Sequence, residues 1–183
     1  MRNVRVPSTK LNVIHADFFS LRPEQKVLAP YVVKTAAGEL RREFIIPKMD
    51  AVIGNPPYTR WIEIPEETQG LIRKHLSKQM KEYGLTPRVS RGLQPGIYTY
   101  WIMHANSFLK EGGRLGMIIS NTWLQTTYGI GFGNFLMDHF RIKAVVDLAL
   151  KLFKGALITT CIVLAERESD EKKRLENKVA FIH

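Results

Sequence analysis

Four consecutive residues, Asn55, Pro56, Pro57 and Tyr58, carry groups that suit chemistry on a planar amine. The Asn55 side chain has a carbonyl acceptor, and the two prolines fix the backbone and remove N–H donors, while the Pro56 carbonyl stays available. Two acceptors can hold both hydrogens of an exocyclic amino group whose ring stacks on Tyr58. Such hydrogen bonds stabilise the positive charge that develops as the nitrogen attacks, so no strong base is needed beforehand.

These residues follow 50–54, a short apolar stretch typical of a strand buried on both faces. Ligands of open α/β sheets bind at the carboxyl ends of strands, and 55–58 would lie at such an end. Further stretches of the same character predict four more strands. They are 11–15, 115–120, 142–148 and 158–165.

Two amphipathic helices are predicted between these strands. Apolar residues recur at three- to four-residue spacing over 97–110, and Gly112 and Gly113 follow as a helix stop. A similar pattern covers 132–140. Strands that alternate with helices favour an α/β fold with a largely parallel sheet. Residues 31–47 predict an inserted β-hairpin around an Ala-Gly turn.

The segment 50–58, Asp-Ala-Val-Ile-Gly-Asn-Pro-Pro-Tyr, resembles motif IV of amino-methyltransferases, within them the N6-adenine DNA methyltransferases of restriction–modification systems, the Eco57I/TaqI-like group. Residues 113–124 and 152–167 are similar to later segments of that family. The resemblance implies a partial Rossmann-like, S-adenosylmethionine-dependent methyltransferase fold, with a mostly parallel sheet and flanking helices over 1–167. Residues 168–183 would be a charged linker or the start of a following element. The alternative interpretation of 50–58 is a Pro-rich turn after a strand.

The resemblance also implies how a flipped adenine would be held. Its N6 amino group would donate to Asn55 Oδ1 and to the Pro56 carbonyl, with Pro57 keeping the corner rigid, and would then attack the methyl group of S-adenosylmethionine. Tyr58 and Phe153 would stack on the two faces of the base. Phe153 as a core residue that caps the sheet is an equally good interpretation.

The cofactor contacts implied by the resemblance are Asp17 and Phe18, in a segment similar to motif III. Asp17 would accept a hydrogen bond from the cofactor's adenine and Phe18 would pack on it, although Asp17 could instead cap a helix. Motif I, the family's acidic and Gly-rich turn, has no match before Leu11. A companion chain or segment would supply it. The Gly-Ile-Gly-Phe-Gly run at 129–133 lies in the wrong order, and we interpret it as a flexible lead-in to the following helix.

The chain is basic, with 27 Lys and Arg residues against 17 Asp and Glu and a formal net charge of +10. Six cations and one acid, Glu82, give the segment 71–94 a charge of +5, half of the total. This cluster predicts contact with the backbone of double-stranded DNA; a solvated helix face is the alternative. The cations are Arg73, Lys74, Lys78, Lys81, Arg88 and Arg91.

Composition excludes several other classes of protein. A single cysteine, Cys161, excludes an intramolecular disulfide and thiolate-rich zinc sites, and the five histidines lack metal-ligand spacing, so no metal site is predicted. No apolar run approaches the roughly 20 residues that cross a bilayer, and no signal peptide is visible. A cytoplasmic, prokaryotic protein without a membrane partner is expected.

Three interpretations of function remain open from the sequence. The first is site-specific DNA adenine-N6 methylation, with the recognition sequence read by a separate target-recognition domain. The second is methylation of RNA or of a protein glutamine, because a planar amide offers the same two hydrogens. The third is a non-catalytic fragment that binds DNA and lacks its own cofactor site.

Overall fold

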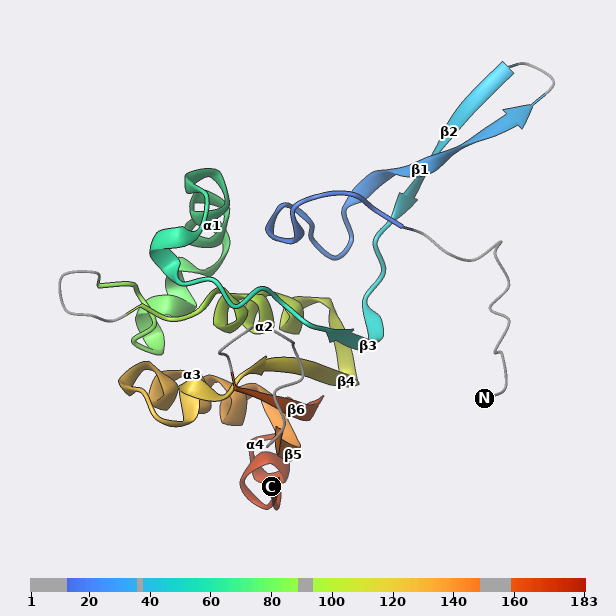
Figure 1. Cartoon of the computed structure of the whole chain (residues 1–183). Helices are drawn as coiled ribbons and strands as arrows, with labels where there is room; N and C mark the ends of the chain where they lie inside the picture. The colour runs from blue at the N-terminus through green and yellow to red at the C-terminus, as the bar shows by residue number, and fades with distance from the viewer. Residues whose placement is uncertain (1–12, 36–37, 89–93, 149–158) are drawn as a thin grey trace. The chain divides into compact units, whose positions relative to one another are not determined.

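The computed structural model describes residues 13–35, 38–88, 94–148 and 159–183 (Figure 1). The chain divides into two compact units, Met1–Pro47 and Lys48–His183. No helix in the described part of the chain is long and apolar enough to span a membrane.

The first unit contains a β-hairpin. Its strands, β1 (Lys26–Thr35) and β2 (Gly38–Ile45), pair antiparallel, with Thr35 opposite Gly38 at the turn end. The hairpin therefore begins five residues before the segment 31–47 in which it was predicted. A one-turn 3-10 helix, η2 (Phe18–Ser20), precedes it.

Residues 13–15 form no strand, so the strand predicted over 11–15 is wrong where the structure describes it. Asp17 is the N-cap of η2, and its carboxylate accepts a hydrogen bond from the Phe19 amide. A cap of this kind competes with strand formation because it gives the local amides another partner.

The second unit is built on a five-stranded sheet with the order β3-β4-β6-β5-β7. The strands are β3 (Met49–Gly54), β4 (Leu109–Ser120), β5 (Phe140–Leu148), β6 (Thr160–Arg167) and β7 (Ala180–Ile182). β3 is parallel to β4 and β5 to β7, whereas β6 is antiparallel to both of its neighbours. The predicted α/β class is confirmed, but the sheet is mixed rather than mostly parallel. Apolar runs indicate burial and carry no information about strand direction.

Three long helices belong to this unit: α1 (Glu66–Glu82), α2 (Ile97–Phe108) and α3 (Thr127–His139). α2 contacts β3 and β4, α3 contacts β5, and the two helices contact each other, so they cover the same face of the sheet (Figure 1). This follows from handedness, because right-handed crossovers that move across a sheet in one direction place their helices on one face.

The predicted helices are found with different ends. α2 ends at Phe108, and Gly112 and Gly113 lie inside β4 instead of stopping the helix. α3 begins five residues before the predicted 132–140. A short helix, α4 (Glu171–Leu175), and β7 occupy the segment 168–183, which was expected to be a charged linker or the start of a following element.

Burial alternates along the central strands. On β4, Leu115, Met117 and Ile119 are buried beneath the helices, whereas the intervening Gly116 and Ile118 are partly exposed. β6 continues this pattern, because its buried residues pair with those of β4 in register. The core therefore lies on the α2–α3 face, and the other face of the sheet is partly open among the described residues.

Candidate active site

The corner formed by residues 55–58 comes directly after the carboxyl end of β3, as the sequence predicts. Pro56 is buried, Asn55 and Pro57 are exposed, and Tyr58 is partly buried. The Tyr58 hydroxyl donates a hydrogen bond to Asn55 Oδ1. Burial, with a smaller contribution from nearby Cys161, raises the pKa of Tyr58, so its hydroxyl remains a donor at neutral pH. This bond uses one of the two lone pairs of Asn55 Oδ1, so the other stays available to an incoming amine.

The direction of β6 decides which other residues lie at the carboxyl ends of β3 and β4. Because β6 runs antiparallel to its neighbours, its first residue, Thr160, pairs with Ser120 at the end of β4 and with Leu148 at the end of β5. The described residues on either side of the segment 149–158, Leu148 and Thr159, therefore lie at the same end of the sheet as the corner. Phe153, the predicted second stacking residue, lies outside the described residues.

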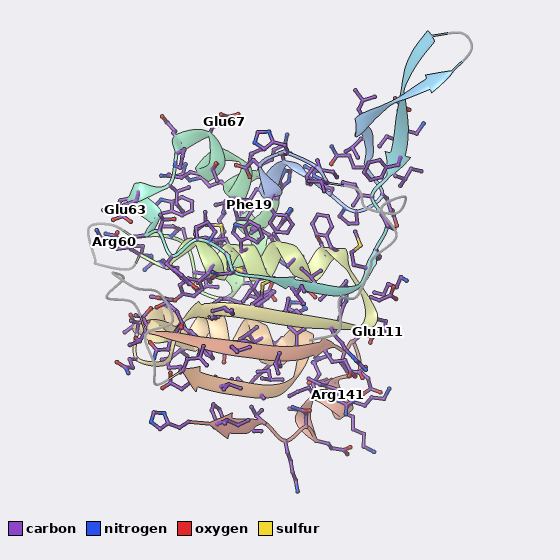
Figure 2. The ribbon with its side chains drawn as sticks, turned by 45° about the vertical axis from the view of Figure 1, so that its right-hand side comes forward. Phe19, Arg60, Glu63, Glu67, Glu111 and Arg141 are labelled. Atoms are coloured by element: carbon purple, nitrogen blue, oxygen red, sulfur yellow. The ribbon has the colours of Figure 1, made fainter. Side chains whose placement is uncertain are left out.

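A pocket of about 290 Å³ lies at the same end of the sheet as the corner. Arg60 is the one charged residue among the described residues that line it, and its guanidinium is paired with Glu63 at 2.6 Å (Figure 2). An uncharged pocket with many hydroxyl groups suits a flat, neutral, polar ring better than an anion. The hydroxyl-bearing lining residues are Tyr58, Tyr98, Ser120, Thr122, Thr126, Tyr128 and Thr159.

Four of these hydroxyls form one cluster. The Tyr98 and Tyr128 hydroxyls lie 2.7 Å apart, and each lies 3.3 Å from Thr122 Oγ1. Ser120 Oγ lies 3.0 Å from Thr122 Oγ1. Burial, together with the neighbouring Tyr128, raises the pKa of Tyr98, so the cluster is neutral at physiological pH. The sequence analysis missed these residues, because they come from α2, α3 and the segment after β4.

Asp17 and Phe18 lie in the first unit. Asp17 Oδ1 accepts a hydrogen bond from the Phe19 amide at 2.8 Å, which is the capping arrangement weighed as an alternative to cofactor binding. A cofactor role for Asp17 and Phe18 stays a prediction.

The glycines at 129–133 lie inside α3, so their interpretation as a flexible lead-in to the helix is wrong. A Cβ atom on Gly129 would come within 1.6 Å of the Trp123 carbonyl oxygen, and one on Gly131 within 1.9 Å of the Tyr83 carbonyl oxygen. These glycines therefore permit close packing of the helix against two other segments.

The predicted DNA-binding cations are brought together on α1. Arg73, Lys74, Lys78 and Lys81 are exposed, while the opposite face of the helix is buried. Arg88 is also exposed, and Arg91 lies outside the described residues. Among the described residues, no carboxylate forms an ion pair with any of these cations.

Metal and thiol chemistry find no support in the described residues. No group of three or more His, Cys, Asp or Glu side chains among them could hold a metal ion. Cys161 is fully buried, and burial raises the pKa of its thiol to about 11, so it is not a nucleophile at neutral pH.

The geometry can be compared with known proteins. The profile of the Eco57I restriction-modification methylases matches residues 29–153, more than half of the chain. The chain belongs to the Eco57I restriction-modification methylase family. This family member is 32% identical over 101 residues to the type II methyltransferase M.BstVI of Geobacillus stearothermophilus, and 33% identical over 114 residues to M.BanIII of Aneurinibacillus aneurinilyticus.

These matches cover 55% and 62% of the Eco57I-family chain, but only 16% and 17% of the two relatives. The chain therefore spans about a sixth of their length.

Solved structures share the fold of the Eco57I-family chain. A Listeria monocytogenes protein described as a class I S-adenosylmethionine-dependent methyltransferase aligns with a TM-score of 0.52 and 18% identity, over 73% of this chain and 36% of its own. The type IIG restriction endonuclease BpuSI aligns with a TM-score of 0.55 and 15% identity, over 85% of this chain and 15% of its own. The fold predicted from the sequence is therefore confirmed.

Proposed function

We propose that the chain is the catalytic and base-binding part of a site-specific DNA adenine-N6 methyltransferase of a restriction–modification system. The observation that carries the proposal is the Asn55–Tyr58 corner at the carboxyl end of β3, beside a hydroxyl-lined pocket, in a member of this family. The matched relatives that support it are named type II methyltransferases.

In this mechanism the chain's own residues hold the base and stabilise charge. Asn55 Oδ1, which also accepts from the Tyr58 hydroxyl, and the Pro56 carbonyl accept the two N6 hydrogens. Tyr58 stacks on one face of the adenine and Phe153 on the other. Stacking returns about 1–3 kcal/mol per base, which offsets much of the cost of flipping. S-adenosylmethionine, when bound, supplies an electrophilic methyl group, and the two acceptors stabilise the positive charge that develops on N6.

The macromolecular partner in this proposal is double-stranded DNA. The unpaired cations on α1 and Arg88 would follow its phosphate backbone, which predicts affinity that falls steeply with salt. The cytoplasm of a prokaryote is the compartment where such a substrate is found. The recognition sequence would be read by a separate target-recognition domain.

The cofactor site needs groups from a companion segment, in the same polypeptide or in another. Asp17 and Phe18 would contact the adenine of S-adenosylmethionine, but the described residues offer no candidate for its methionine and ribose. β3 lies at one edge of the sheet, and its Ile53 is 82% exposed. A strand added there, with right-handed crossovers in the opposite direction, would place its helices on the open face. Such a reversal of strand order is where α/β folds bind ligands.

The test is methyl transfer to duplex DNA by the chain joined to its companion segment. Asn55→Ala should lower turnover by about a hundredfold or more, because one of two charge-stabilising acceptors is lost, and should leave DNA affinity unchanged. Tyr58→Phe is the matched control. It keeps the stacking ring and loses only the hydroxyl bond to Asn55, so it should stay within about tenfold of the parent.

RNA of the same sequence and a glutamine-containing peptide complete the assay. Faster methylation of either one than of DNA would favour the second interpretation of the sequence. Unchanged turnover of Asn55→Ala on DNA would sink the assignment of the corner as the catalytic site.

A further inference from the structure

A second pocket, of about 330 Å³, lies beside α1 and shares no lining residue with the hydroxyl-lined pocket. Two cations, Arg73 and Lys81, and two hydroxyls, Ser77 and Thr86, line it together with Trp61. We call it the Trp61 groove. Its combination of positive charge and hydroxyl donors differs from that of the neutral pocket at the corner.

Arg73 is held in place within this groove. Its guanidinium carbon lies 5.0 Å from the centre of the Trp61 ring, and its Nη2 donates to Gln69 Oε1 at 3.0 Å. Gln69 is fixed in turn, because its Nε2 donates to the carbonyls of Trp61 and Ile64 at 3.2 and 2.9 Å. Trp61 is 3% exposed and packs edge-on against Tyr100. The planar fork of Arg73 is therefore ordered before a ligand binds, which lowers the entropic cost of binding.

Only some of the cations on α1 belong to the groove. Arg73, Ser77 and Lys81 follow one another at four-residue spacing and so lie along one side of the helix. Lys74 and Lys78 are exposed on the same helix but do not line the groove. Among the described residues, no carboxylate forms an ion pair with Arg73 or Lys81. Their charge is therefore available to an anion from outside the chain.

We infer that the Trp61 groove binds a phosphate group of the DNA backbone. The Arg73 fork matches two oxygens of a phosphodiester, Lys81 adds a second positive charge, and Ser77 and Thr86 can donate to the same group. The inference rests on the proposed function only in taking DNA as the source of the phosphate. The inference also ranks the cations of the segment 71–94 by their contribution to DNA binding. The sequence alone gives no reason to distinguish Arg73 from Lys74.

The experiment is fluorescence anisotropy of a short labelled DNA duplex with the whole chain, over a series of salt concentrations. Arg73→Gln should weaken binding about tenfold or more, the loss expected for a charge-assisted contact, and should lower the salt slope by about 0.9. Arg73→Lys should recover only part of the loss, because an ammonium group has no planar fork. Lys74→Gln removes a cation of the same helix that lies outside the groove, so it should weaken binding less than Arg73→Gln does, by about threefold.

Four results would overturn the inference. Equal losses for Arg73→Gln and Lys74→Gln, or parent-like binding by Arg73→Lys, would mean that charge alone matters. Tighter binding of an RNA duplex of the same sequence would assign the groove to RNA. Displacement of the DNA by inorganic phosphate at similar concentrations would indicate a free-phosphate site. The assay uses no cofactor, so the groove can stand while the methylation proposal fails, and the reverse.

Discussion

Asn55 and Tyr58 hold each other before any ligand binds, because the Tyr58 hydroxyl occupies the Asn55 carbonyl. Binding of an amine at Asn55 and stacking on Tyr58 are therefore coupled, since the amine would share the Asn55 oxygen with the Tyr58 hydroxyl. Cys161, which is fully buried, also contributes to the raised pKa of Tyr58.

Cys161 should be protected from alkylation in the folded chain. Burial raises its pKa from 9.0 to about 11, so the reactive thiolate is scarce below pH 9, and the side chain is fully buried. With iodoacetamide at pH 8, mass spectrometry should show labelling about a hundredfold slower in the native chain than in urea. Because the folded pKa is the higher one, the native rate should still rise as pH passes 9. A native rate equal to the rate in urea would contradict the burial of this thiol.

α3 is positioned by two glycines that let its backbone approach other segments. Gly131 faces the Tyr83 carbonyl oxygen, where α1 ends, and Gly129 faces the backbone of Trp123 after β4. Tyr128, at the start of the same helix, belongs to the hydroxyl cluster of the pocket. The packing of α3 therefore sets the wall of the proposed base pocket, although no glycine takes part in binding.

Gly131→Ala should destabilise the chain, whereas Gly133→Ala should not. A Cβ at position 131 would lie 1.9 Å from a backbone oxygen, an overpacking that costs about 1–3 kcal/mol or more. At position 133 the nearest atom is a Trp123 ring carbon at 3.9 Å, and alanine should add up to about 1 kcal/mol through helix propensity. Urea unfolding followed by circular dichroism measures both. Similar values for the two variants would show that α3 does not pack closely at Gly131.

Within the second unit, the described residues cover one face of the sheet and leave the other partly open. α2 and α3 lie on the same face, and Leu164, in the middle of β6, is still 42% exposed on the other. Ile53 on the edge strand β3 contacts the same region, because a Cβ on Gly116 would meet its Cγ2 at 3.3 Å. Apolar residues on an edge strand and on an uncovered face are what the proposed companion segment would bury.

The isolated 183-residue chain should therefore bind S-adenosylmethionine poorly. Isothermal calorimetry should detect no binding at micromolar concentrations, because the methionine and ribose side of the site would come from the companion segment. The same chain should still bind duplex DNA in the anisotropy assay, and its circular dichroism spectrum should show that it is folded. Micromolar affinity for the cofactor would refute the need for a companion segment.

Local patterns determined a large part of this protein. The apolar run 50–54 followed by two prolines fixed a strand and a rigid corner, and three- to four-residue spacing fixed the helix that became α2. These features depend on neighbours in sequence, so they can be inferred from it. The Asn55–Tyr58 corner and the basic face of α1 were identified in this way.

Tertiary structure alone decided which distant residues meet. The antiparallel direction of β6 brings Thr159 to the end of the sheet that holds the corner. The apolar sequence of β6 would fit either strand direction. Packing likewise joined Tyr98, Thr122 and Tyr128 into one cluster and set Arg73 on Trp61. The physical reason is that side-chain pattern encodes burial and local conformation, whereas strand direction and the convergence of separate elements depend on long-range packing.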